Sequence, residues 1–195
     1  MGRFSQAISE GDGISIIPML EGDVAELAAL AEEAGAEAIA VWSADDIERA
    51  RAETALPILA RGSKGSADAC LFAFRELLDH GEAEELYLSL AREGIDCVLE
   101  VSNDEELEEA LERIDPEIIL ISEREPDEGL EELERTLDLL PDVPAGKLVI
   151  SEAHIVAREQ VVALERAGVD AILVGGDFLR SSPDFASALA ELTGR

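Results

Sequence analysis

The chain has 195 residues, of which 45 are Asp or Glu and 15 are Lys or Arg, so its formal net charge is −30. This excess of acidic groups argues against binding to nucleic acids or anionic membranes, because both require clustered Lys and Arg. Hydrophobic residues make up 47% of the chain, and no apolar run approaches the roughly 18 residues of a membrane span. Since the sequence also begins without an apolar leader, we expect one cytoplasmic domain covering residues 1–195.

Eight short runs rich in Ile, Leu, Val and Ala recur along the chain and predict strands. They do not alternate strictly between polar and apolar residues, which is typical of parallel strands buried on both faces. The runs cover residues 14–20, 36–42, 56–61, 67–74, 96–101, 117–122, 147–152 and 171–176.

Amphipathic segments with Glu on one face lie between most of these runs and predict helices that cover a sheet. The clearest of them cover residues 24–35, 103–114, 128–140 and 158–168. A helix end followed by Gly, an acidic residue and a strand recurs as EAGAEAIAV, EGIDCVLEV and RAGVDAILV. Eight predicted strands that alternate with helices predict an α/β fold of the (β/α)₈ type, a TIM barrel. An open doubly wound sheet is the alternative. In that fold a Gly-rich fingerprint often follows the first strand, and this sequence has none after its first run.

One connection is too short to contain a helix. Only GSKGS, residues 62–66, separates the third and fourth runs, whereas a parallel crossover normally takes a dozen or more residues. Five extended residues span about 17 Å, the length of a short strand. The sequence therefore predicts a trimmed barrel without the helix between strands 3 and 4, unless one of the two runs is not a strand. Whether the outer faces of these strands are left exposed stays open.

The two cysteines, Cys70 and Cys97, lie in apolar runs, and neither has a histidine close to it in sequence. We expect reduced thiols in the core, because a nucleophilic cysteine needs a neighbouring base. The sequence has no metal-ligand spacing and no P-loop, GxGxxG or GxSxG motif. It therefore predicts neither a metal site nor a bound cofactor.

Five segments occur in a recognisable order: ETALPILAR, DCVLEVSNDEELEEAL, IILISERE, LVISEAHI and AGVDAILVGGDFLR. They resemble LPVLRKDF, ALVEVHDEAELERAL, IGINNRDL, VVSESGI and AGADAVLVGEALMR of the indole-3-glycerol-phosphate synthase family of tryptophan biosynthesis. The resemblance extends from about residue 14 to the C-terminus. It implies a lyase that closes a pyrrole ring on a carboxyphenylamino-deoxyribulose phosphate, with loss of CO₂ and water and without a cofactor.

The resemblance assigns roles to a few polar positions and glycines. Glu100 and Glu152 match the Glu residues of the family's strands five and seven, and are candidates to move protons. Arg124 matches the family's strand-six Arg. Gly175 matches the glycine that ends strand eight, and with Gly176 it is the candidate cradle for a small anionic phosphate ligand.

Other family positions carry different residues. The Glu and Lys of strand one fall on Met19 and Glu21, the strand-three Lys on Arg61, the strand-six Asn on Ser122, and the strand-seven Ser and Gly on Ala153 and His154. Arg61 can stabilise an oxyanion but is a poor general acid. Lys64, in the following loop, is either a replacement for the catalytic lysine or a solvated residue. His154 is either a new acid or base or a plug in the former phosphate site.

Three functions remain open on this basis. The first is a synthase-like barrel with a degenerate site and weak or lost activity, and the second is a non-catalytic barrel that binds an anionic metabolite or a partner protein. Such a partner is a second copy or another tryptophan-pathway enzyme. The third is a different sugar-phosphate enzyme with Glu100 as base and Lys64 or His154 as acid. Glu100 and Glu152 are accordingly a working pair or part of an Arg–Glu cluster with Arg61 and Arg124.

Overall fold

The computed structural model describes residues 2–11, 13–62, 65–80, 83–123, 133–155, 157–175 and 184–194. The strands are β1 (Ser15–Pro18), β2 (Ile39–Val41), β3 (Ile58–Arg61), β4 (Ala69–Ala73), β5 (Asp96–Val101), β6 (Ile118–Ser122), β7 (Leu148–Glu152) and β8 (Ala171–Val174). The helices are α1 (Arg3–Ser9), α2 (Val24–Glu33), α3 (Ala44–Glu53), α4 (Phe74–His80), α5 (Ala83–Glu93), α6 (Asp104–Arg113), α7 (Glu134–Leu139), α8 (Arg158–Ala167) and α10 (Phe185–Thr193), with the 3₁₀ turn η1 (Leu140–Asp142).

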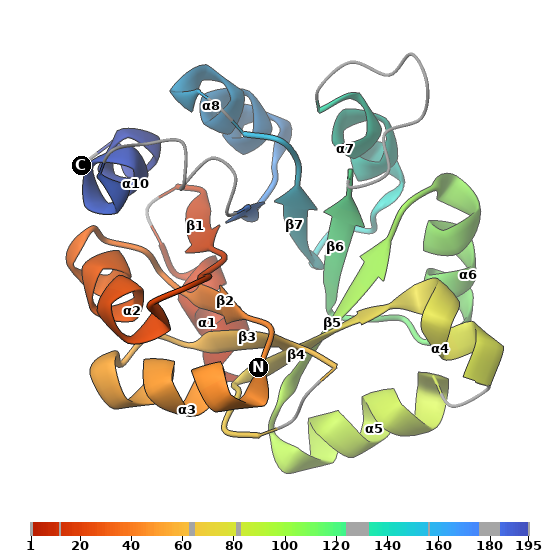
Figure 1. Ribbon diagram of the computed structural model, residues 1–195. Helices are drawn as coiled ribbons and strands as arrows, with labels where there is room; N and C mark the ends of the chain where they lie inside the picture. Colours follow the sequence, from red (N-terminus) through yellow and green to blue (C-terminus); the bar gives the residue numbers. More distant parts are fainter. Residues whose placement is uncertain are drawn as a thin grey trace.

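The eight strands pair in parallel in the order β1-β8-β7-β6-β5-β4-β3-β2, and the outer helices surround them (Figure 1). This arrangement confirms the predicted TIM barrel and excludes the doubly wound alternative. Each predicted apolar run contains one of the strands. No helix in the described part of the chain is both long enough and apolar enough to span a membrane.

The barrel interior is filled by apolar side chains from alternate positions of the strands, as the two-residue period of a strand requires. A single cluster of fully buried residues forms this filling, among them Ile17, Leu59, Val98, Leu120, Ile150 and Leu173. Phe4 and Ile8 of α1 pack against the same cluster. Helix α1 therefore covers the end of the barrel where the strands begin, and leaves the opposite end for a site.

The N-terminus of α1 is attached to the start of β5. The Asp96 carboxylate accepts hydrogen bonds from the backbone N–H groups of Gly2 and Ser5, at 3.0 and 2.8 Å, and from the Ser5 hydroxyl at 3.1 Å. A carboxylate here satisfies N–H groups that the helix itself leaves without partners.

The barrel is nearly closed, and β1 and β2 meet only at an isolated parallel bridge. The donors of β1 that face β2 are at alternate residues. Leu20 donates to the Ala40 carbonyl at 2.9 Å, Pro18 has no N–H, and Ile16 donates instead to the Glu37 carboxylate at 3.0 Å. Because proline cannot donate to a ladder, it weakens this seam where a backbone bond would otherwise form.

The link between β3 and β4 contains no helix in its described residues, and the two strands are neighbours with Leu59 opposite Ala69. The predicted trimming is thus confirmed. Gly62 has a φ of +60°, a conformation that favours glycine and begins the chain reversal. At the other end, Asp68 lies beside the start of β3, and its N–H donates to the Ile58 carbonyl at 2.9 Å.

The outer faces of β3 and β4 are nevertheless covered. Ile58 and Ala60 are fully buried against Ile47 and Ala50 of α3. Cys70 of β4 is fully buried in a cluster that includes residues of α5. The two neighbouring helices therefore replace the missing one, and no bare apolar strip is left on these strands.

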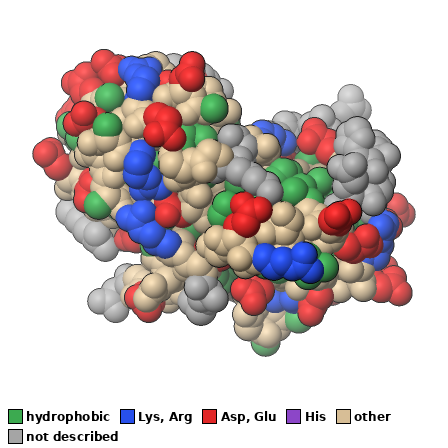
Figure 2. All heavy atoms as spheres, turned by 90° about the horizontal axis from the view of Figure 1, so that it is seen from below, with side chains coloured by type: hydrophobic (Ala, Val, Ile, Leu, Met, Phe, Trp, Pro, Cys, Tyr) green, Lys and Arg blue, Asp and Glu red, His purple; other side chains and the backbone are tan. Residues whose placement is uncertain are grey.

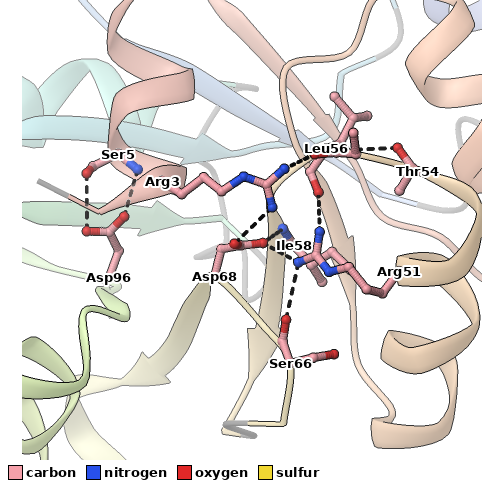
Figure 3. A network of polar contacts seen from close by, with 10 residues as sticks. Arg3, Ser5, Arg51, Thr54, Leu56, Ile58, Ser66, Asp68 and Asp96 are labelled. Carbon is pink, nitrogen blue, oxygen red and sulfur yellow. Dashed lines mark hydrogen bonds and ion pairs between the residues drawn. The ribbon is translucent and has the colours of Figure 1, made fainter.

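A polar network around Asp68 holds this region together (Figure 3). The Asp68 carboxylate accepts from the Ile58 N–H at 2.9 Å, from the Arg3 guanidinium at 3.1 Å and from Arg51. Arg51 also donates to the carbonyls of Leu56 and Ser66. One carboxylate thus connects α1, α3, β3 and the returning link.

The acidic side chains are dispersed over the visible surface, with basic side chains between them (Figure 2). On α6, Arg113 lies 3.0 Å from both Glu84 and Glu109, and on α3 Arg49 lies 2.9 Å from Asp46. These exposed pairs offset some of the repulsion, although each contributes little on its own.

The two cysteines are free and buried, as expected, and lie opposite each other on β4 and β5. Burial raises the pKa of the Cys97 thiol to about 12, and Cys70 and Asp96 add smaller contributions in the same direction. A thiol with so high a pKa is not an activated nucleophile.

We predict that Asp68→Asn destabilises the fold by about 1–3 kcal/mol, because a charged acceptor with three donors is replaced by a neutral amide. Urea unfolding of the wild type and the variant measures the difference. Asp23→Asn is the control, since Asp23 is exposed and pairs only with Arg49 at 3.3 Å among the described residues. This control should change stability by less than about 0.5 kcal/mol. Equal effects of the two substitutions would show that the Asp68 network does not support the trimmed link.

We also predict a pH dependence from Cys97. Its pKa is higher in the folded chain than in the unfolded chain, so the folded state retains a proton that the unfolded state loses above pH 9. Stability from this group is therefore complete below pH 9 and decreases between pH 9 and 12, by up to about 1.4 kcal/mol per pH unit. The free energy of unfolding of the wild type should therefore fall relative to that of Cys97→Ala as the pH is raised from 8 to 10.5. A constant difference would contradict the prediction.

Candidate functional site

The candidate site lies at the end of the barrel where the strands finish, and the strand period places its residues there. Leu59, Val98, Leu120, Ile150 and Leu173 point into the filled interior. The next inward positions, two residues further along, are Arg61, Glu100, Ser122, Glu152 and Gly175. Four predicted side chains and one predicted glycine, from five separate segments, therefore lie around one rim, on the face where barrel enzymes carry their sites.

Arg61 and Glu100 form an ion pair across β3 and β5. The Arg61 Nη2 atom lies 2.9 Å from the Glu100 Oε2 atom, and the Glu100 side chain is only 8% exposed. The Arg61 Nη1 atom is buried and has no hydrogen-bond partner among the described residues. The pair thus satisfies the carboxylate but leaves part of the guanidinium without an acceptor.

Glu152 and Ser122 meet on the neighbouring strands β7 and β6. The Ser122 hydroxyl donates to the Glu152 Oε2 atom at 3.3 Å, and both residues are buried. Arg135 of α7 donates from Nη1 to the Ser122 carbonyl at 2.8 Å. This second group of polar side chains continues the rim beyond the Arg61–Glu100 pair.

Arg135 is a rim residue that was not predicted from the sequence. It is 8% exposed, and lies one helical turn before the buried Leu139 on α7. That four-residue spacing to an inward-facing Leu was the available signal, because positions i and i+4 share one face of a helix. A charged residue on such a face has to find a partner, and here the end of β6 supplies it.

The start of α7 is itself held by the end of β6. The Glu123 carboxylate accepts from the N–H groups of Leu133 and Thr136, each at 3.1 Å, and from the Thr136 hydroxyl at 2.7 Å. Thr136 also shares a 2.8 Å hydrogen bond with Ser151. These contacts fix the direction in which Arg135 leaves the helix.

The other predicted site residues make no printed contact with these two groups or lie outside the described part of the chain. Gly175 directly follows β8, and among the described residues a Cβ added to it would meet nothing nearer than the Met19 methyl group, at 4.0 Å. His154 follows β7 as an exposed residue, so it does not form a buried plug. Lys64, Arg124 and Gly176 lie outside the described residues.

Two residues at the family's strand-one positions are placed around the seam. Met19 is half-buried against the barrel filling, and Glu21 is exposed in the link to α2. Lys147 lies before β7 at the opposite end of the barrel, where it pairs with Asp115. Lys147 therefore cannot contribute to chemistry at the rim.

A cavity of about 450 Å³ opens above β3 to β6. It is lined by Arg61, Ala73, Phe74, Arg75, Glu76, Glu100, Ser102, Asn103, Glu106, Ser122 and Arg135. Within the described ranges, no three His, Cys, Asp or Glu side chains converge in a way that could hold a metal ion. The arrangement can bind oxygen-rich groups through its guanidinium, hydroxyl and carboxylate groups.

Comparison of the fold with solved structures identifies TIM-barrel neighbours. The mutant tryptophan synthase α-subunit (D110A) from Pyrococcus furiosus superposes with a TM-score of 0.73 at 15% identity, over 93% of this chain and 98% of that one. The N-acetylmannosamine-6-phosphate 2-epimerase from Clostridium perfringens has a TM-score of 0.72 at 17% identity, over 89% and 90% of the two chains. At such low identity these matches support the fold alone.

The part of the chain that contains most of the candidate site residues matches a known family in sequence. The family model of indole-3-glycerol phosphate synthase matches residues 59–192, which include β4 to β8 and all of β3 except its first residue. An indole-3-glycerol phosphate synthase of Geobacillus sp. (strain WCH70) is 35% identical over 126 residues, which are 65% of this chain and 48% of that protein. The chain thus spans about half the length of that curated relative. Because the family model matches more than half of it, the chain belongs to the indole-3-glycerol phosphate synthase family.

Proposed function

We propose that this barrel binds a small anionic ligand at its C-terminal face and that the family's ring-closing activity is weak or lost in it. The observation that supports this proposal is the ion pair between Arg61 and Glu100, at 2.9 Å. By resemblance, these two positions carry the general-acid lysine and a proton-moving carboxylate in the family. Here they are bound to each other.

The chemistry of arginine favours binding over proton transfer. A guanidinium stays protonated at neutral pH, so it can stabilise a negative oxygen but cannot act as an acid that gives up its proton. General acid catalysis works best when the group exchanges its proton near the working pH. Replacing the family lysine by Arg61 therefore retains charge at this position and removes a proton donor.

The unpartnered part of Arg61 supports ligand binding. Its buried Nη1 atom has no acceptor among the described residues, and leaving such a donor unsatisfied costs about 1–3 kcal/mol. Modest movement of the side chain would let a carboxylate or phosphate oxygen accept from it while Oε2 of Glu100 keeps the other nitrogen. Charge-assisted contacts of this kind are stronger than neutral hydrogen bonds.

The remaining predicted residues have proposed roles around this pair. Gly175, which has no described side chain crowding it, and Gly176 would admit a phosphate group, and Arg124 would neutralise part of its charge. Ser122 would donate or accept a hydrogen bond at the ligand. In this proposal Lys64 and His154 are auxiliary residues at the rim and not a replacement acid.

A still active synthase is the second candidate, because Glu100 and Glu152 are both buried at strand ends, as the resemblance requires. In that case Glu100 moves protons, and Arg61 or Lys64 takes over the task of the family lysine. Turnover separates the two candidates.

We predict at most slow product formation when the purified protein is incubated with 1-(2-carboxyphenylamino)-1-deoxyribulose 5-phosphate, in low salt and in molar salt. Indole fluorescence reports product formation, and Glu100→Gln is the comparison. The physical reason is that no described residue at the strand-three position can donate a proton at neutral pH. Rapid, sustained turnover that disappears in Glu100→Gln would contradict the proposal and establish an active synthase.

We also predict that Arg61 and Glu100 are energetically coupled. Removing Arg61 leaves the Glu100 carboxylate, which is 8% exposed, without this partner. Arg61→Met should therefore lower the free energy of unfolding more in the wild-type background than in the Glu100→Gln background. The double-mutant cycle should give a coupling of about 1–3 kcal/mol. The matched control is the exposed pair Arg113 and Glu109 on α6, at 3.0 Å, for which no resolvable coupling is expected. Similar coupling in both cycles would remove the structural basis of the proposal.

A further inference from the structure

The two cysteines lie side by side on the outer face of the barrel wall. Cys70 of β4 and Cys97 of β5 are direct partners in the parallel register of these strands. Their chain neighbours Leu71 and Val98 belong to the barrel filling, so both thiols point the other way, toward α5. There they form one buried cluster with Leu90 of α5. The chain contains no other cysteine, so each thiol has the other as its nearest possible disulfide partner.

The spacing of the strands suits a bond between these thiols. Neighbouring strands lie about 4.7–4.9 Å apart, and the Cα atoms of a disulfide are usually about 4.4–6.8 Å apart. Cys70 and Cys97 are opposite each other and face the same side of the sheet. A bond between their Sγ atoms therefore requires rotation of the side chains and only a small adjustment of the backbone. The next pair along the ladder, Leu71 and Val98, keeps the same register.

The two thiols differ in their access to solvent. Cys97 is 7% exposed and lines a cavity of about 360 Å³, whereas Cys70 is fully buried. The described lining of this cavity includes Tyr87, Gly94 and Asp96, at the end of the barrel opposite the candidate site. A cavity of this size admits an oxidant as small as hydrogen peroxide. Such an oxidant reaches Cys97 first, and Cys70 is then the thiol beside the oxidised sulfur.

We propose that Cys70 and Cys97 form a redox-sensitive pair, which a peroxide converts into a disulfide between β4 and β5. The Cys97 sulfur attacks one oxygen of hydrogen peroxide and the O–O bond breaks. The departing hydroxide takes up the thiol proton, which leaves a sulfenic acid and one water. The Cys70 sulfur then attacks the sulfenic sulfur, so that an S–S bond forms and the S–O bond breaks. The second hydroxide leaves as water with the Cys70 proton. Two thiols thus lose two electrons and two protons, and the peroxide becomes two waters.

The surroundings of the pair make this reaction slow. Burial raises the pKa of the Cys97 thiol to about 12, and Cys70 adds to this effect. Because only the thiolate attacks, a small fraction of Cys97 is reactive at neutral pH. The described lining of the cavity contains no Lys, Arg or His that would stabilise the thiolate. The pair therefore responds to sustained peroxide and does not turn over as a catalyst.

The disulfide would join two strands that are separated in sequence by α4 and α5. Such a bond restricts the unfolded chain more than the folded one, so the oxidised protein should resist unfolding better than the reduced protein. This inference is independent of the proposed function, because the thiols face α5 and not the candidate site.

Peptide mapping of the whole protein after exposure to hydrogen peroxide tests the proposal. The folded protein is treated with peroxide, its remaining thiols are alkylated in denaturant, and it is digested. Trypsin places the two cysteines in separate peptides, residues 65–75 and 93–113. Mass spectrometry should find these peptides joined and released from each other by dithiothreitol. The oxidised protein should also unfold at a higher urea concentration than the same sample after reduction.

The rate of oxidation distinguishes the folded protein from its unfolded fraction. Between pH 7 and 9 the rate should rise about tenfold per pH unit, because the thiolate fraction rises by this factor below the pKa. Urea at concentrations below the unfolding transition should leave the rate unchanged, since the reaction takes place in the folded state.

Two variants separate the roles of the thiols. Cys70→Ala should stop at an oxidised Cys97 that dimedone labels, whereas Cys97→Ala should leave Cys70 reduced, because Cys70 is fully buried. The joined peptides are measured on the wild type, so the main result does not depend on the folding of either variant.

Four results would overturn the inference. The first is that both cysteines remain free to be alkylated after peroxide treatment, and the second is that they are joined only between two chains. The third is that oxidised and reduced protein unfold at the same urea concentration. The fourth is an oxidation rate that increases with urea in proportion to the unfolded fraction.

Discussion

The two-residue period of the strands is the constraint on which the C-terminal face depends. Leu59 and Val98 point into the filled interior. Arg61 and Glu100, two residues further along the same strands, therefore point toward the barrel axis as well, at its C-terminal end. The ion pair between them follows from that geometry and from their positions near the ends of β3 and β5, the two strands on either side of β4. A slip of one residue in either strand would carry the charged side chain to the outer face, where apolar helices pack. The site is therefore as rigid as the packing below it.

Where the barrel lacks regular elements, side-chain carboxylates provide the missing hydrogen bonds. Glu37 accepts from Ile16 beside the proline gap of the β1–β2 seam, and Asp68 accepts from Ile58 where a helix is absent. Asp96 similarly holds the N-terminus of α1. Some of the acidic residues of this chain thus perform structural work that backbone groups perform elsewhere, and they connect parts of the barrel that are distant in sequence.

The net charge of the whole chain differs from the charge of the described lining of the candidate site. The chain as a whole carries −30, whereas the described lining of the cavity contains three arginines and three glutamates. Long-range repulsion of anions by the surface is screened by salt, so recognition at the rim depends on short-range contacts. This combination favours a ligand with many hydrogen-bonding groups over one held by net charge alone.

The sequence by itself determined the class of fold, the trimmed β3–β4 link and the ends of strands at which polar residues occur. These features are local: apolar runs, helix periodicity and a five-residue gap can be read without knowing what lies opposite. The family resemblance likewise pointed to Glu100 and Glu152. Only the tertiary structure decided that Arg61 binds Glu100, that Arg135 reaches Ser122 from α7, and that Phe74 is fully buried in the core. Pairing and orientation of side chains depend on the closure of the barrel and on helix packing, which join residues tens of positions apart and leave no periodic signal in the sequence.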